Sequence, residues 1–275
     1  MLPRGAAFQL DAPRRRPDAA HRCAYDRPRR GARRDGEATM TTAQSELLTT
    51  TDWLADHLDG VGSEFALIDA GEAVAYRRAH IPGAVGLPHP YLKGREQTRL
   101  VMTAPEFESL AGRLGISNDT PVVIYDDNAS LHAARVWWVF EHFGHRDVRV
   151  VDGGLNAWLD EGRPLTSAPA RPEAATFEAR VDRGAHCTVD ELLAIVEAGP
   201  DAPDAPQIWD TRSDGEWDGS NDRGNDRAGH VPGAKHLEWL RLMQGPPSRR
   251  FRPLDEIRAL IEGAGIDPEA ATVTY

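Results

Sequence analysis

Short apolar runs alternate along the chain with longer segments of helical periodicity. The runs FALIDA (65–70), PVVIY (121–125) and VRVVDG (148–153) predict strands, and PVVIY is apolar at every position, as in parallel strands buried on both faces. Segment 105–114 predicts a helix, because its apolar residues recur at the spacing of one helix face. Segment 131–143 predicts a second helix. This alternation predicts an α/β fold, with parallel sheets and helices on both faces.

The pattern occurs twice. The segment AYRRAHIPGAVGLP (75–88) returns as DRAGHVPGAKHLEW (226–239), so His80 and His230 stand 150 residues apart in a shared H-[IV]-P-G-A motif. The same offset relates two further pairs, Gly115 with Gly265 and Tyr125 with Tyr275. The sequence therefore predicts two tandem domains of one architecture, the second of them incomplete.

The predicted boundaries follow from this repeat and from changes in composition. The first domain spans residues 43–165, a linker rich in Pro, Ala and Thr covers 166–177, and the second domain spans 178–275. Measured against the first copy, the second lacks about 40 residues, so its sheet is expected to be incomplete and some helix surfaces uncovered.

Residues 1–42 differ from the rest in charge and in pattern. The first 40 residues hold ten Arg against five acidic residues and show no apolar period, so this extension is predicted to be disordered. It could serve as a nucleic-acid or targeting tail, or it could be a plain flexible extension, including one translated ahead of Met40.

Composition limits the class of protein further. The 275 residues are 40% hydrophobic and 27% charged, as in a soluble globular protein, and no apolar run reaches 18 residues. The net charge of -11 makes nucleic-acid binding by the folded part unfavourable, and no membrane partner is indicated. Only two cysteines and no secretory signal predict a cytoplasmic protein. The oligomeric state stays open.

Ligands of such sheets bind at the carboxyl ends of the strands. After PVVIY the chain continues as Asp126-Asp127-Asn128-Ala129-Ser130 and enters a helix, whose N-terminus suits an anion or a thiolate. Because this loop is itself acidic, we expect it to be a capped, solvated loop without chemistry. In the second copy the corresponding loop would begin directly after Tyr275.

The repeated histidines are better explained as turn residues than as metal ligands. Neither His80 nor His230 has a second ligand at the usual spacing, whereas the Pro-Gly that follows each one predicts a tight turn. No metal site is predicted. Trp137 and Trp138 are expected to pack in the core or between the domains.

Taken in order, these motifs resemble the two-domain rhodanese family of sulfurtransferases. The resemblance covers about residues 45–275 and rests on Asp69 with HIPGA, VVIYDDNASLHAARVWWVFEHFGHRDVRVVDGGLNAW, and QIWDTRSDGEWDG with GHVPGA and ATVTY. It implies that the first domain is catalytically silent, with Asp126 where the active copy has cysteine. It also implies that the nucleophilic cysteine is expected directly after Tyr275, beyond the truncated second domain.

Family chemistry is transfer of sulfane sulfur from thiosulfate or 3-mercaptopyruvate, through a cysteine persulfide, to a thiol or cyanide. Arg212 matches the family's substrate-contacting arginine, whose fork suits an anionic donor; the alternative is a surface ion pair with Asp214 or Glu216. The resemblance implies no metal or organic cofactor.

Neither cysteine of this chain fits the nucleophile. Cys23 lies in the extension, and Cys187 precedes a helix start, where a modestly reactive thiol or an incidental small residue is expected. These 275 residues alone are therefore expected to be inactive. The competing interpretation is a non-catalytic rhodanese module that binds a partner or an anion.

Overall fold

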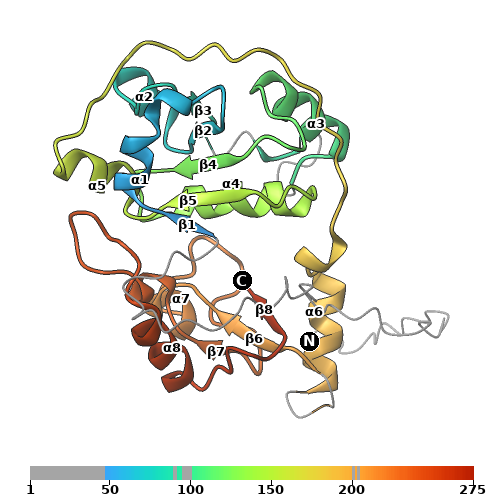
Figure 1. The fold of residues 1–275 in the computed structure, drawn as a ribbon. Coiled ribbons are helices and arrows are strands. Elements are labelled where there is room, and N and C mark those ends of the chain that lie inside the picture. Colours follow the sequence, from blue (N-terminus) through green and yellow to red (C-terminus); the bar gives the residue numbers. More distant parts are fainter. Residues whose placement is uncertain (1–46, 89–91, 95–100, 200–201, 203–204) are drawn as a thin grey trace, which may run out of the picture.

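The computed structural model describes residues 47–88, 92–94, 101–199, 202 and 205–275. The predicted disordered extension and Cys23 lie outside these residues. Two parallel sheets organise the described chain (Figure 1). The first has five strands in the order β1 (Leu48–Thr49), β5 (Val148–Val151), β4 (Val122–Tyr125), β2 (Ala66–Asp69) and β3 (Val85–Gly86). The second has three strands in the order β7 (Lys235–His236), β6 (Gln207–Asp210) and β8 (Thr272–Thr274).

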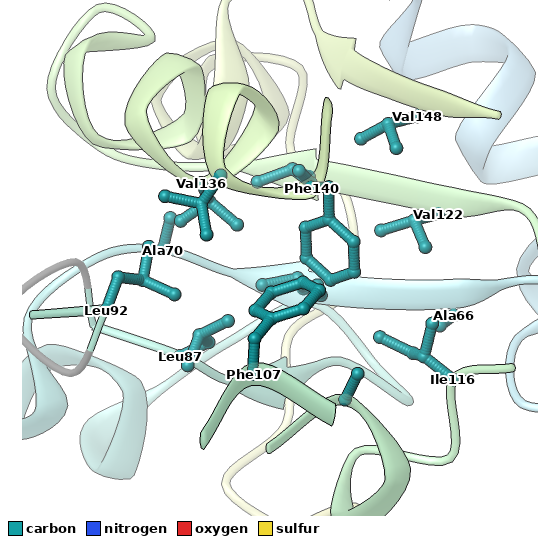
Figure 2. Close-up of a cluster of buried hydrophobic side chains, with 14 of the residues drawn as sticks. Ala66, Ala70, Leu87, Leu92, Phe107, Ile116, Val122, Val136, Phe140 and Val148 are labelled. Atoms are coloured by element: carbon teal, nitrogen blue, oxygen red, sulfur yellow. The ribbon is translucent and has the colours of Figure 1, made fainter. Parts of the chain in front are cut away.

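Helices cover both faces of the first sheet, as predicted. One cluster joins Val122 and Ile124 of β4 to the aromatic rings of Phe107 and Phe140 (Figure 2). These two rings come from α3 (Ala104–Arg113) and α4 (Leu131–His142). They meet edge to face with centroids 5.0 Å apart, a favoured aromatic geometry.

The opposite face of β4 carries a second cluster. Val123 and Tyr125 pack there with Leu54 of α1 (Thr51–Asp56) and Trp158 of α5 (Gly154–Asp160). Successive side chains of a strand point to opposite faces, so two apolar clusters require a strand that is apolar throughout. The continuous PVVIY run is explained in this way, and the prediction of a doubly buried strand is confirmed.

The helices of the second half bury much less. They are α6 (Val189–Ala198), α7 (Asp214–Asp218) and α8 (Leu254–Gly263), with a 3-10 turn at Trp239–Leu242, and none of their residues is buried among those described. Val189 and Leu193 of α6 are 73% and 53% exposed. The expectation of uncovered helix surfaces is confirmed for this part of the chain.

The segment predicted as linker lies against the first sheet and its helices. It runs as an extended stretch around the outside of that half, from α5 to α6 (Figure 1). Ala175 N–H donates to the Gly112 carbonyl at 2.9 Å, and Phe177 is buried beside Phe107 with ring centroids 5.3 Å apart. Residues 166–177 therefore complete the first core in addition to connecting the two halves.

Candidate functional site

The loop between β4 and α4 forms a cradle of backbone amides around one carboxylate. Asp126 Oδ1 accepts hydrogen bonds from Asn128 N at 3.0 Å and Ser130 N at 2.9 Å. Its Oδ2 accepts from His132 N at 2.7 Å and Ala133 N at 2.9 Å. Four donors on one carboxylate make a strong anion site at a helix N-terminus, and Asp126 fills it from within.

The geometry of this cradle corrects one expectation. Asp126 is 2% exposed, so it is capped but not solvated, whereas its neighbour Asp127 is exposed. Ala129 and Ser130 adopt positive φ angles of 54° and 66°, which turn successive amides toward the carboxylate. Gly154 closes the site from α5, because a Cβ there would lie 2.2 Å from the Asp126 carbonyl oxygen.

Arg212 stands at the carboxyl end of β6 and is held by the residue two positions before it. Its Nε donates to Asp210 Oδ1 at 3.0 Å and its Nη2 to Asp210 Oδ2 at 2.5 Å. Nη2 also donates to the Gly229 carbonyl at 3.0 Å, and the guanidinium lies 4.9 Å from the Tyr275 ring centroid. The arginine is therefore fixed beside the end of β8.

Neither of the two ion-pair partners that the sequence suggested is the partner of Arg212. Asp214 pairs with Arg241 at 2.8 Å, and Glu216 accepts from Ser213 Oγ at 2.8 Å. The fork of Arg212, which was expected to face an anion, is occupied by Asp210. Nε and Nη2 are engaged by Asp210 and Gly229, and Nη1 makes no hydrogen bond to either of these two residues.

Strand β2 of the first sheet also ends in an aspartate, but no arginine follows it. Asp69 ends β2 as Asp210 ends β6, but the residue two positions later is Gly71, whose N–H donates to Asp69 Oδ1 at 2.8 Å. A Cβ on Gly71 would lie 2.9 Å from that oxygen. The chain therefore places a cation at one strand end and leaves it out at the other.

The pKa values of Asp69 and Asp210 are shifted in opposite directions. Burial raises the pKa of Asp69 above its ordinary value of 3.8, and the nearby charge of Asp127 adds to this rise. Burial also acts to raise the pKa of Asp210, but hydrogen bonds from the Arg212 side chain and backbone outweigh it and leave that pKa lowered. Only the second strand end keeps a fixed pair of opposite charges.

One further hydrogen bond is the same in the two halves. Tyr125 Oη accepts from Ile81 N at 3.0 Å, and Tyr275 Oη accepts from Val231 N at 2.9 Å. These four residues follow the same offset of 150. Tyr275 therefore has the structural setting of Tyr125, and the position that corresponds to Asp126 is the one after Tyr275.

The two motif histidines make turn contacts. His80 Nδ1 lies 2.7 Å from the Tyr76 carbonyl and its Nε2 lies 3.2 Å from the Ala168 carbonyl, while His230 Nδ1 lies 2.9 Å from the Trp217 carbonyl. The Pro-Gly glycines that follow have φ angles of about 80°. Both observations fit the turn interpretation.

The remaining residues singled out from the sequence lie elsewhere. Cys187 is half-buried in the loop before α6, with Sγ 3.6 Å from the Thr188 carbonyl, and it is not at a strand end. Trp138 Nε1 donates to the Ala185 carbonyl at 2.8 Å, which ties α4 to the segment that leads into α6. This contact fits the predicted packing between the two halves.

Sequence reasoning missed a polar group around the backbone of Arg212. His236 Nε2 lies 2.9 Å from the Arg212 carbonyl, and Asp214 joins His236 to Arg241. The sequence did show that His236 replaces Gly86 of the first copy. This difference alone does not predict that the histidine contacts the Arg212 carbonyl.

The fold and the site together define an α/β protein with two related parallel sheets, one anion cradle filled by its own carboxylate, and one arginine poised at the other strand end. The Rhodanese-like domain family matches residues 50–161. The chain is 34% identical over 244 residues to the sulfur carrier protein TtuD of Thermus thermophilus, with 86% of this chain and 84% of that protein covered.

Two further relatives agree. The thiosulfate sulfurtransferase of Bos taurus is 34% identical over 237 residues, covering 80% of this chain and 77% of the relative. The crystal structure of SseA from Escherichia coli, described among the 3-mercaptopyruvate sulfotransferases, superposes with a TM-score of 0.71 at 27% identity. It covers 82% of this chain and 87% of that one. The chain belongs to the rhodanese family.

Proposed function

We propose that this chain is a sulfurtransferase that moves sulfane sulfur from thiosulfate or 3-mercaptopyruvate to a thiophilic acceptor, a thiol or cyanide. Its relatives named thiosulfate sulfurtransferase and its likeness to SseA support this activity. The observation that carries the proposal to this chain is the Asp210-Arg212 pair, a fixed cation beside the end of β8.

The chemistry needs a thiolate in the cradle position of the second sheet. A cysteine thiolate attacks the outer sulfur of thiosulfate, the S–S bond breaks, and sulfite leaves while the cysteine becomes a persulfide. Cyanide then takes the outer sulfur as thiocyanate and the thiolate is restored. We place this cysteine directly after Tyr275, because Tyr275 has the setting of Tyr125 and Asp126 follows Tyr125.

In this scheme Arg212 binds the anionic donor through its Nη1 edge, and the first domain is catalytically silent because Asp126 already satisfies its amide cradle. The proposed domains are 43–165 and 178–275, joined by 166–177. No described helix is long and apolar enough to cross a membrane. A cytoplasmic location is part of the proposal and rests on the sequence.

The test compares two proteins. We expect the 275-residue chain to show no thiosulfate:cyanide sulfur transfer above background, because Cys187 is not at a strand end. The chain extended through the residues encoded after Tyr275 should form thiocyanate, and replacing the first added cysteine by serine should abolish this activity. Thiocyanate is measured as its iron complex.

Two results would count against the proposal. Transfer by the 275-residue chain that survives Cys187→Ser and Cys23→Ser would show that the nucleophile has been placed wrongly. An inactive extended chain would favour the alternative, a non-catalytic module. Arg212→Lys in the extended chain should raise the KM for thiosulfate, because lysine cannot hold both oxygens of Asp210 and present a third nitrogen.

A further inference from the structure

A chain of polar contacts reaches the backbone carbonyl of Arg212. Arg241 Nη2 donates to both oxygens of Asp214, at 2.9 and 2.8 Å. Asp214 Oδ1 lies 3.7 Å from His236 Nδ1, and His236 Nε2 lies 2.9 Å from the Arg212 carbonyl. Since a carbonyl can only accept, His236 must carry a proton on Nε2 and donate it there, and its contact with Asp214 is attractive when Nδ1 carries a proton as well.

The histidine itself is firmly placed. Its side chain is 14% exposed, and its ring stacks on Trp217 with centroids 4.9 Å apart and an interplanar angle of 8°. Trp217 in turn stacks on His230 at 3.5 Å. The stacking holds the plane of the His236 ring, and Nε2 points at the carbonyl of Arg212.

The first sheet provides an internal comparison, because it builds the same loop without these groups. In the strand register, Asp69 lies opposite Gly86, whereas Asp210 lies opposite His236. Counted from these two aspartates, which are 141 residues apart, Gly71 corresponds to Arg212 and, two residues later, Ala73 corresponds to Asp214.

Folding alone does not require His236 or Asp214, since the loop of the first sheet forms with Gly86 and Ala73 at the corresponding positions. The histidine and the carboxylate are present in the half that carries Arg212. Glycine at position 86 also leaves room for the Tyr76 ring, to which a Cβ would come within 2.9 Å. The polar group is therefore tied to the arginine and is not a common feature of the two loops.

We propose that His236, oriented by Asp214, is a positioning residue for Arg212: it holds the Arg212 peptide so that the guanidinium stays in the plane of Asp210 and presents its Nη1 edge toward the cradle position. The substrate role of Arg212 rests on the proposed function, but the positioning does not. Asp210 accepts a hydrogen bond from the Arg212 side chain, and His236 donates one to the Arg212 carbonyl, so both the side chain and the backbone of Arg212 are fixed.

The first arm of the test needs no catalysis. In the 275-residue chain, the exchange of the Arg212 Nε proton with water is measured by NMR, with the resonance assigned through Arg212→Lys. His236→Gly, which installs the residue of the first sheet, should speed this exchange about five- to tenfold, the effect of losing one hydrogen bond. His236→Gln should restore most of the protection, because its amide can donate to the same carbonyl.

Two further variants test whether the change in exchange is specific to the contact between His236 and Arg212. Asp214→Ala keeps the histidine but removes the carboxylate that faces its Nδ1, so it should speed the exchange in the same direction by a smaller factor. His230→Gln removes the other ring stacked on Trp217 without touching Arg212, and it should leave the rate within about twofold of wild type. An unchanged rate in both His236→Gly and Asp214→Ala would overturn the proposal, since Asp210 alone would then fix the arginine.

The second arm uses the extended chain. His236→Gly should raise the KM for thiosulfate about five- to tenfold, while the turnover at saturating thiosulfate changes less than about twofold, and His236→Gln should recover the KM. If wild-type extended chain transfers no sulfur, the proposed function fails, and the proton-exchange arm still decides whether His236 positions Arg212.

Discussion

At the scale of single residues, Asp69 and Asp210 hold the same place in their sheets and differ in what faces them. Asp69 is buried without a cation, so its pKa is raised, while hydrogen bonds from Arg212 overcome burial and lower the pKa of Asp210. A folded state that raises an acid's pKa is destabilised as that acid ionises, and one that lowers the pKa is stabilised.

The two residues should therefore give opposite pH dependences when each is replaced by asparagine. For Asp69→Asn, the stability of the variant relative to wild type should rise as the pH increases above 3.8 toward neutral, because wild type must ionise a buried acid. For Asp210→Asn, the variant should fall further behind wild type as the pH rises through the lowered pKa of Asp210 to about 3.8, and the deficit should then stay constant toward neutral, because the ion pair is fully formed above 3.8.

Urea unfolding at a series of pH values from below 3.8 to neutral measures both differences, the Asp210 change below 3.8 and the Asp69 change above it. The two curves should diverge with pH and approach each other in acid. Parallel curves would contradict the assignment of the two settings, since they would mean that the presence of Arg212 does not distinguish the two strand ends.

Asp126 carries a second prediction at this scale. Asp126→Ala leaves four inward-facing amides of the cradle without their acceptor, so we expect the free energy of unfolding to fall by about 2–4 kcal/mol. Asp127→Ala, at the exposed neighbour, should change it by less than about 0.5 kcal/mol. Equal effects of the two substitutions in urea unfolding would show that the cradle does not depend on its carboxylate.

At the scale of elements, the extended segment after α5 behaves as part of the first core. Phe177 is 4% exposed and meets Phe107 and His145 edge to face, with centroids 5.3 and 5.8 Å apart. Phe177→Ala should lower the free energy of unfolding by about 3–4 kcal/mol, the usual cost of removing a buried aromatic ring.

Thr176→Ala is the matched control, because Thr176 is exposed in the same segment. It should change stability by less than about 0.5 kcal/mol. A comparably small effect of Phe177→Ala in denaturant unfolding would mean that residues 166–177 only connect the halves.

The sequence allowed the elements to be predicted well, because apolar spacing determines which faces are buried. The predicted strand at 121–125 is observed as Val122–Tyr125 and the helix at 131–143 as Leu131–His142. The packing of the linker could not be predicted, since its Pro, Ala and Thr content indicates a connection and a single phenylalanine does not reveal its contacts. The ion-pair partner of Arg212 could not be predicted for a similar reason, because pairing with Asp210, two residues earlier at a strand end, depends on the loop geometry.

At the scale of the whole molecule, Arg250 links the two halves. It donates to the Asp152 carbonyl and to Thr51 Oγ1, each at 3.3 Å, and it forms an ion pair with Glu161. The next residue, Phe251, donates its N–H to Asp152 Oδ1 at 2.8 Å. One loop of the second half thus contacts both the end of β5 and two helices of the first.

Arg250→Ala should weaken this coupling. We expect a stability loss of about 1–2 kcal/mol, from the lost hydrogen bonds and ion pair, and a denaturant transition that broadens as the halves unfold less cooperatively. Arg258→Ala, whose partners Glu262 and Glu269 belong to the second half, should leave the shape of the transition unchanged. A sharp single transition in Arg250→Ala would indicate that other contacts couple the halves.

The buried Phe177 also has a consequence for synthesis on the ribosome. Domains tend to fold as units in the order in which they emerge. The first sheet can close its core only after the chain has emerged past Phe177, well beyond its last helix, α5, which ends at Asp160. A nascent chain that pauses between these points exposes the Phe107 face, and the residues that lead into the second half are the ones that cover it.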